Sequence, residues 1–195
     1  MSFRRALLLI IIAEIGVAFL GVINYGFTID GLQATTRFSG RLSLAGFSLI
    51  FLFQRSEKFN IRTVLSEKYF TVFAIAHGIH LIELLSFLYA SGAQPPLYRL
   101  AGGFLAYALI FFMPIAQLLL EKGKITARQF ATLNLVYVYY VWFIFFMTYL
   151  PRVRGTLPNV GGSYTEFVIL LGWVSMMMGI KLQDLIAVKR NSAHD

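Results

Sequence analysis

The chain lacks cysteine and has few charged residues, and each of these features excludes some classes of protein. There is no cysteine among the 195 residues, which excludes disulfides, thiolate-ligated haem, iron–sulfur clusters and thiol redox catalysis. Only 13% of the residues are charged, whereas 58% are hydrophobic and the mean hydropathy is +0.71. A soluble domain of this size needs more polar surface. The composition therefore predicts a single transmembrane domain over residues 1–195, with the lipid bilayer as its main partner.

The sequence also lacks the short motifs of nucleotide and hydrolase chemistry. It contains no G-x-G-x-x-G, no P-loop and no nucleophile elbow, so we expect no bound nucleotide or flavin. If electrons enter this chain, another protein must deliver them. The net charge of +8 does not predict nucleic-acid binding, because Lys and Arg collect in the cytoplasmic loops of membrane proteins.

Long apolar runs dominate what is present. A hydrocarbon core of about 30 Å requires roughly 20 mostly apolar residues per helix, and six segments qualify: 6–24, 37–54, 69–90, 99–120, 130–150 and 164–183. The first resembles a signal peptide, but its apolar run is too long. Barrel strands would alternate polar and apolar residues, whereas these runs do not. The predicted fold is an all-α integral membrane bundle of six transmembrane helices.

The basic residues of the connecting segments predict an orientation. Twelve of the 17 Lys and Arg fall on the side of the two termini, and five on the other side. The five are Arg37, Arg41, Arg99, Arg152 and Arg154. By the positive-inside rule, both termini are cytoplasmic. We expect a multi-pass protein of a cell membrane, the inner membrane of a bacterium.

Ionisable residues occur inside these apolar segments, where they are costly and often functional. His77, His80 and Glu83 fall three apart in "AIAHGIHLIELL" and share one side of a helix. At about 1.5 Å per residue, Glu14 and His77 both lie roughly 12 Å from the cytoplasmic boundary, and His80 roughly 16 Å. Arg41 and Glu83 both lie roughly 21–24 Å from it. These depths predict a Glu14–His77 hydrogen bond and an Arg41–Glu83 ion pair, either of which is also explained as a structural tie between helices.

Two stretches carry a resemblance to a known family. From "TTRFSGRLSLAGFSLIFLF" to "EKYFTVFAIAHGIHLIELLSFLY", the chain resembles the ferric reductase-like transmembrane domain, in particular the haem-bearing membrane subunit of the bacterial methionine sulfoxide reductase system. The family's T/S-G-R-x-A/S-L motif is matched by Ser39–Leu44, and its haem-ligating histidine by His80. The resemblance covers roughly residues 35 to 150. It implies a membrane electron-transfer protein with haem b, and makes His80, His77 and Arg41 candidate residues of the haem site.

The sequence departs from this family on the fifth predicted helix. The family has two histidines about thirteen residues apart there, whereas this chain has Asn134 and Met147. Three alternatives follow. One haem b is held between His80 and Met147; it is held by His80 alone; or the bundle is haem-free and acts as an accessory or scaffold subunit of a membrane complex. His/Met ligation is chemically sound, but Met147 is also explained as simple packing. Each alternative implies a protein partner, as electron donor, electron acceptor or host complex.

Other interpretations of the polar and aromatic residues stay open. His77, His80 and Glu83 offer two or three ligands for a metal, with Glu14 as a fourth. The aromatic cluster "YVYYVWFIFF" and the two tryptophans are typical of membrane helices and also of quinone or pigment pockets. The small residues of "GVAFLG" (16–21) and "AGGFLAYA" (101–108) predict close packing between helices or between protomers.

Overall fold

A computed structural model describes residues 1–54, 61–156 and 162–191 of the chain. The described residues form helices and connecting turns, without any strand. The helices are α1 (Phe3–Tyr25), α2 (Ile29–Phe53), α3 (Ile61–Leu65), α4 (Tyr69–Ser91), α5 (Leu97–Glu121), α6 (Ala127–Val153) and α7 (Tyr164–Asn191). The prediction of an all-α fold is confirmed.

Five of these helices are long and apolar enough to cross a membrane: α1, α4, α5, α6 and the first twenty residues of α7. They indicate a multi-pass membrane protein. The predicted second span, α2, is not among them. Its 25 residues suffice in length, but Arg37, Arg41 and several hydroxyl residues lower its hydropathy. Eleven of its residues are buried, because α2 packs against α1, α4 and α7. A helix enclosed by other helices does not need an apolar surface.

The helix boundaries differ from prediction mainly in α2. It begins at Ile29 rather than at residue 37, and the Thr28 side chain caps its first turn by accepting from the Gly31 amide at 3.1 Å. The polar stretch "DGLQATT" concealed these two turns from a search for apolar runs. Arg41 consequently lies about 18 Å from the start of its helix, well inside it. The structure also adds the short α3 and extends α7 beyond residue 183.

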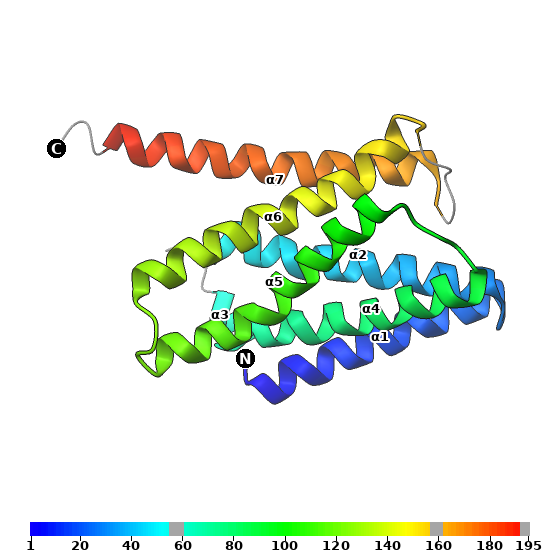
Figure 1. Cartoon of the computed structure of the whole chain (residues 1–195), viewed down its shortest axis with the longest axis horizontal. Helices are drawn as coiled ribbons and strands as arrows, with labels where there is room; N and C mark the ends of the chain where they lie inside the picture. The colour runs from blue at the N-terminus through cyan, green and yellow to red at the C-terminus, as the bar shows by residue number, and fades with distance from the viewer. Residues whose placement is uncertain (55–60, 157–161, 192–195) are drawn as a thin grey trace.

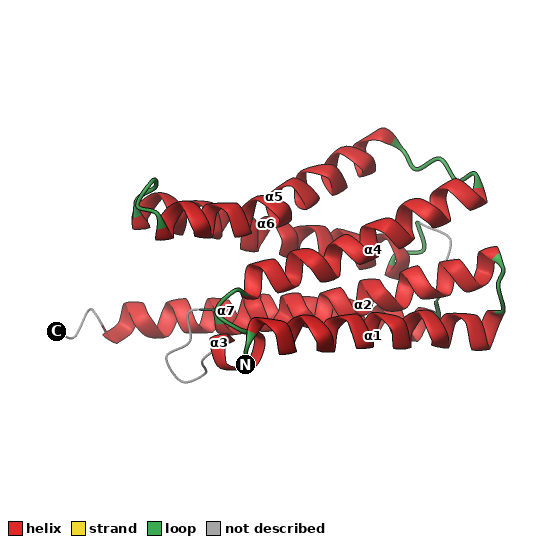
Figure 2. Ribbon diagram, turned by 90° about the horizontal axis from the view of Figure 1, so that it is seen from below, coloured by secondary structure: helices red, strands yellow, loops and turns green. Residues whose placement is uncertain are grey.

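The helices form two groups that lie side by side (Figures 1 and 2). Helices α1, α2 and α4 pack closely on one another, while α6 lies between α5 and α7. Helices α4 and α5 diverge toward the loop that joins them (Figures 1 and 2). Both ends of the described chain lie at the same end of the bundle (Figure 1), and there the N-terminal amino group donates to the Thr63 carbonyl at 2.6 Å.

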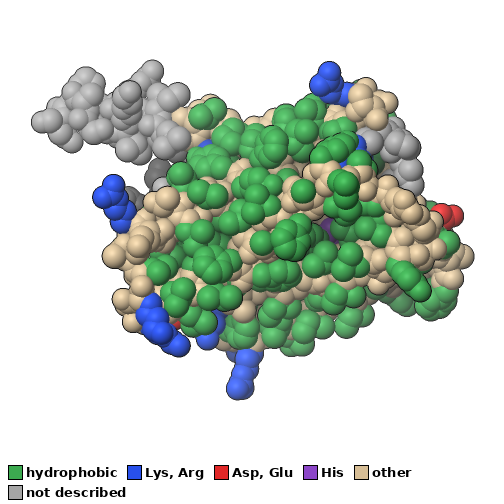
Figure 3. Space-filling model, in the orientation of Figure 1, with side chains coloured by type: hydrophobic (Ala, Val, Ile, Leu, Met, Phe, Trp, Pro, Cys, Tyr) green, Lys and Arg blue, Asp and Glu red, His purple; other side chains and the backbone are tan. Residues whose placement is uncertain are grey.

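Close packing of α1 on α2 depends on small residues. A Cβ added at Gly21 would lie 2.1 Å from Thr35 Oγ1, and one added at Gly31 would lie 2.1 Å from the Gly26 carbonyl oxygen. The predicted packing role of the α1 glycines is thus confirmed for Gly21. Gly16 faces open space, so it does not pack between helices of one chain, and packing between protomers stays a prediction for it. Hydrophobic side chains cover most of the face in Figure 3, with Lys and Arg toward its margins, as expected for a surface in lipid.

Candidate functional site

The three polar residues of α4 point in three directions around that helix. Each step of three residues turns the side chain by about −60°, so His77 and Glu83 are about 120° apart with His80 between them. His77 faces α5 and α6, His80 faces α2, and Glu83 faces the contact between α1 and α2. The three residues of the H-x-x-H-x-x-E motif therefore lie in three different environments.

His77 lies within a group of aromatic rings. Its ring centroid is 5.4 Å from that of Phe73, 4.8 Å from Tyr107 and 6.2 Å from Phe145. The residue is 8% exposed, and its Nδ1 has no hydrogen-bond partner among the described residues. The fourth ring beside it is His80, at 5.4 Å. Its surroundings on three sides are those of a packed aromatic side chain.

His80 lies against the backbone of α2 at Gly40. A Cβ added at Gly40 would lie 3.0 Å from Cε1 of His80 and 3.5 Å from Nε2, so a larger residue there would require the imidazole to shift by a few tenths of an ångström. Nδ1 of His80 is buried and forms no hydrogen bond of standard geometry in the described part of the chain, although the imidazole lies within reach of the Thr36 backbone carbonyl on α2. Figure 3 shows imidazole atoms, in purple, between hydrophobic side chains on the displayed face. His77 is buried, whereas His80 is partly exposed.

Glu14, Ser39 and Glu83 form a second polar cluster, contributed by α1, α2 and α4. The carboxyl groups of Glu14 and Glu83 both lie beside Ser39 and near each other. Glu14 is 4% exposed and Ser39 fully buried. Several buried oxygen atoms of this cluster form no hydrogen bond of standard geometry within the described residues. They are both carboxyl oxygens of Glu14, the Ser39 hydroxyl and Oε2 of Glu83. The predicted Glu14–His77 hydrogen bond is wrong, because His77 faces α5 and α6 while Glu14 lies on the opposite side of α4.

Arg41 does not pair with Glu83 as predicted. Its Nη2 donates to Oε2 of Glu166 on α7 at 2.9 Å, and its guanidinium lies 5.4 Å from the centre of the Phe38 ring. Side chains two residues apart on a helix differ in direction by about 200°. Arg41 and Ser39 therefore point to opposite sides of α2. Matched depths are not enough for an ion pair, since the two side chains must also face each other.

Met147 is 43% exposed and lies on the outer side of α6. Asn134, Val141 and Phe145 form part of the buried side of this helix. Phe145, which contacts His77, points about 200° away from Met147. The structure therefore brings His77 and His80 together but does not bring Met147 to them. Asn134 is buried, and its Oδ1 is without a partner in the described ranges.

The remaining candidates have structural explanations. Nowhere in the described residues do three His, Cys, Asp or Glu form a group able to hold a metal ion, so the metal-site interpretation finds no support. Trp142 Nε1 donates to the Val174 carbonyl at 2.9 Å and Trp173 Nε1 to Ser48 Oγ at 2.8 Å. Both tryptophans thus tie α7 to the bundle. His194 lies outside the described residues.

Sequence reasoning missed three members of this region: Ser39, Gly40 and Glu166. Ser39 and Gly40 were visible as parts of the S-G-R motif, but nothing in the motif indicates which helix each residue faces. Glu166 stands at the third position of α7, beyond the region of the resemblance. No family model, curated protein or solved structure matched the chain in the three comparisons. The resemblance to ferric reductase-like domains consequently stays a prediction.

Proposed function

We propose that this chain is a membrane electron-transfer protein of the ferric reductase-like type, holding at most one haem b through His80. The observation that carries the proposal is the pair of imidazoles on α4, both with a buried Nδ1 that forms no hydrogen bond of standard geometry among the described residues. Unpaired buried nitrogen atoms are costly and usually have a functional explanation. Neutral imidazole is also the commonest axial ligand of haem b.

The residues present fit a haem with one protein ligand. Gly40 lets the His80 ring lie close to α2, with Cε1 3.0 Å and Nε2 3.5 Å from where a Cβ would stand, and a neutral imidazole is a chemically suitable haem ligand. They do not fit the His80–Met147 pair, since Met147 faces outward. His77, enclosed by three aromatic rings, is assigned a packing role beside the ligand.

When bound, haem b would supply one-electron redox chemistry. The chain's own residues have other roles in this proposal. His80 would bind the iron, Gly40 lets His80 lie close to α2, and Phe73 and Phe145 pack beside the neighbouring His77. Arg41, fixed by Glu166, positions α2 against α7 and is not a ligand. A protein partner supplies or removes the electron, because the sequence contains no nucleotide-binding motif.

The proposal includes six spans, with α2 as the sixth, and cytoplasmic termini in the inner membrane of a bacterium. Its supports are the 25-residue length of α2, the location of both chain ends at one end of the bundle and the excess of Lys and Arg on that side. Fusion of a reporter enzyme after Lys124 and after Gly92 tests the orientation. A cytoplasmic signal at Lys124 and an external one at Gly92 are expected.

A second candidate is a haem-free accessory subunit of a membrane complex. The observation that favours it is α6, whose buried face presents Tyr137, Val141 and Phe145 and no histidine. A bundle without a histidine on α6 as second haem ligand would keep the helix packing of the ferric reductase-like family but would hold no cofactor.

An absorption spectrum of the purified protein, produced with ample haem, separates the two candidates. The electron-transfer proposal predicts a Soret band and, after dithionite reduction, an α band. Met147→Leu is expected to leave the spectrum and midpoint potential unchanged, because this side chain faces outward. A preparation without Soret absorbance would reject haem binding and leave the accessory role.

A further inference from the structure

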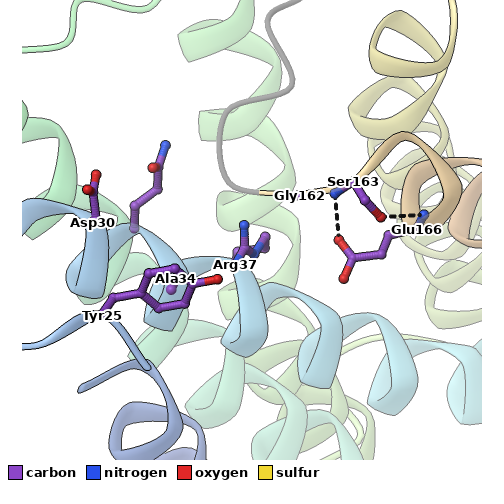
Figure 4. Close-up of a pocket in the computed structure, with 8 residues that line it drawn as sticks. Tyr25, Asp30, Ala34, Arg37, Gly162, Ser163 and Glu166 are labelled. Atoms are coloured by element: carbon purple, nitrogen blue, oxygen red, sulfur yellow. Dashed lines mark hydrogen bonds between the residues drawn. The ribbon is translucent and has the colours of Figure 1, made fainter. Parts of the chain in front are cut away.

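A polar cavity of about 470 Å³ lies at the end of the bundle opposite the termini. Its walls come from the end of α1, the first three turns of α2, and the start of α7 with the two residues before it (Figure 4). The side chains that define its chemistry are those of Tyr25, Asp30, Gln33, Arg37, Ser163 and Glu166. Ligand sites in proteins are typically cavities of 300–1,000 Å³ with a few polar groups, so the size is suitable for a small ligand.

The charges around the cavity are of both signs. Glu166 is already engaged, since its Oε2 accepts from Arg41 at 2.9 Å and from the Ser163 amide at 2.9 Å. Arg37 lies 5.1 Å from the centre of the Phe38 ring, and its Nε is buried without a hydrogen-bond partner among the described residues. Asp30 is exposed in the first turn of α2. The cavity thus presents one guanidinium, that of Arg37, and two carboxylates, of which Glu166 is bound by Arg41 and lies near Arg37, while Asp30 faces a ligand at the outer end.

The two groups are arranged along the helix. Asp30 and Arg37 are seven residues apart on α2, so they share one face and are separated by about 10.5 Å along the axis. Asp30 is near the outer end of α2, whereas Arg37 lies two turns deeper in the bundle. In a zwitterionic phospholipid the phosphate is deeper in the membrane and the ammonium group lies farther out. The order of the charges in the cavity matches the order of the charges in such a headgroup.

We propose that this cavity binds a zwitterionic phosphate group, with the phosphate at Arg37 and the ammonium at Asp30. Arginine is well suited to phosphate, because its planar guanidinium donates two parallel hydrogen bonds. Tyr25 and Gln33 add neutral donors beside it. The source of this chemistry is a phosphatidylethanolamine headgroup or the free phosphoethanolamine ester, and the site is separate from His80.

Native mass spectrometry of the full chain in detergent tests the proposal. The probes are phosphatidylethanolamine, phosphatidylglycerol (which has the phosphate but no ammonium) and free phosphoethanolamine. Arg37→Gln is expected to reduce retention of phosphatidylethanolamine at least about tenfold, in line with the loss of a charge-assisted hydrogen bond. Asp30→Asn is expected to remove the preference for phosphatidylethanolamine over phosphatidylglycerol. Arg37→Lys, which keeps the charge, covers the case in which Arg37→Gln fails to fold.

Matched controls use charges outside the cavity. Arg99→Gln at the start of α5 and Glu67→Gln at the opposite end of the bundle are expected to retain the lipid as the native chain does. Binding of the lipid identifies a headgroup site, and binding of phosphoethanolamine alone identifies a soluble ligand; both support the proposal. Equal retention of both lipids by the native chain and by Asp30→Asn would overturn it, as would retention unaffected by Arg37→Gln.

Discussion

Two groups of buried polar residues in this bundle differ in how they are satisfied. Where α7 packs on α2 and α6, both tryptophan donors have a partner: Trp173 donates to Ser48, and Trp142 to the Val174 carbonyl. Where α1, α2 and α4 meet, the carboxyl oxygens of Glu14 and the hydroxyl of Ser39 have no such partner within the described residues. Satisfied groups stabilise a fold, whereas buried unsatisfied ones reduce stability, and a functional role is one explanation for their presence. The α7 side is therefore structural, and the α1–α2–α4 side is where function is expected.

The largest effect is expected from breaking the close packing of α1 on α2. Gly21→Val places side-chain atoms where Thr35 Oγ1 already lies, since an added Cβ alone would approach it to 2.1 Å. Overpacking of this kind typically destabilises by about 1–3 kcal/mol or more. We expect the variant to accumulate poorly and to melt well below the native protein in detergent. Gly16→Val is the matched control, because that position faces open space; if both variants behaved alike, close α1–α2 packing would be contradicted.

On the α7 side, removal of a satisfied hydrogen bond is expected to be moderately destabilising. Trp173→Phe keeps the aromatic ring but removes the donor to Ser48, leaving that hydroxyl with its contacts to the Leu44 carbonyl and Met177 Sδ. The expected cost is about 1 kcal/mol. Chemical denaturation in mixed detergent micelles measures it. An unchanged unfolding free energy would show that this side is not stabilised by its hydrogen bonds.

On the α1–α2–α4 side, removal of a buried acidic group is expected to leave the free energy of unfolding unchanged or to raise it. Glu14→Gln removes an acidic group that is 4% exposed and lacks a partner in the described structure, and the amide can also donate to neighbouring oxygens. We expect stability to be unchanged or to rise by up to about 1 kcal/mol, since buried groups without partners are destabilising. A loss of 2 kcal/mol or more would mean that Glu14 has a structural partner, and the contrast between the two sides would fail.

The smallest effect concerns the ion pair between α2 and α7. Arg41 and Glu166 are partly exposed, at 24% and 42% of their side chains, so their coupling is expected to be about 0.5–1 kcal/mol. A double-mutant cycle with Arg41→Gln and Glu166→Gln measures it. The cycle of Arg41→Gln with Glu83→Gln is the control, expected near zero. Coupling to Glu83 instead of Glu166 would restore the pairing predicted from depth.

The sequence was sufficient to predict where most of the helices lie along the chain. It was insufficient to predict how each helix is rotated about its own axis. Apolar runs located α4 within one residue at its C-terminal end. The three-residue spacing predicted that His77, His80 and Glu83 share one side of this helix, whereas they span about 120° and face different neighbouring helices. The start of α2 was missed because a helix enclosed by others tolerates polar residues. The predicted partners of Arg41 and Glu14 were wrong because depth in the membrane gives only the position along the helix axis and not the direction of the side chain. Which helix a side chain faces depends on packing, in particular on Gly21 and Gly40, and a single sequence does not contain that information.

The central claim is that His80, and not the neighbouring His77, holds a haem. The direct measurement is the haem content per chain of the native protein, His80→Ala and His77→Phe, purified side by side from cells supplied with haem. We predict up to one haem per native chain, none in His80→Ala, and near-native content in His77→Phe, because phenylalanine preserves the ring contacts with Phe73, Tyr107 and Phe145. Haem retained by His80→Ala, or haem absent from the native chain, would contradict the account.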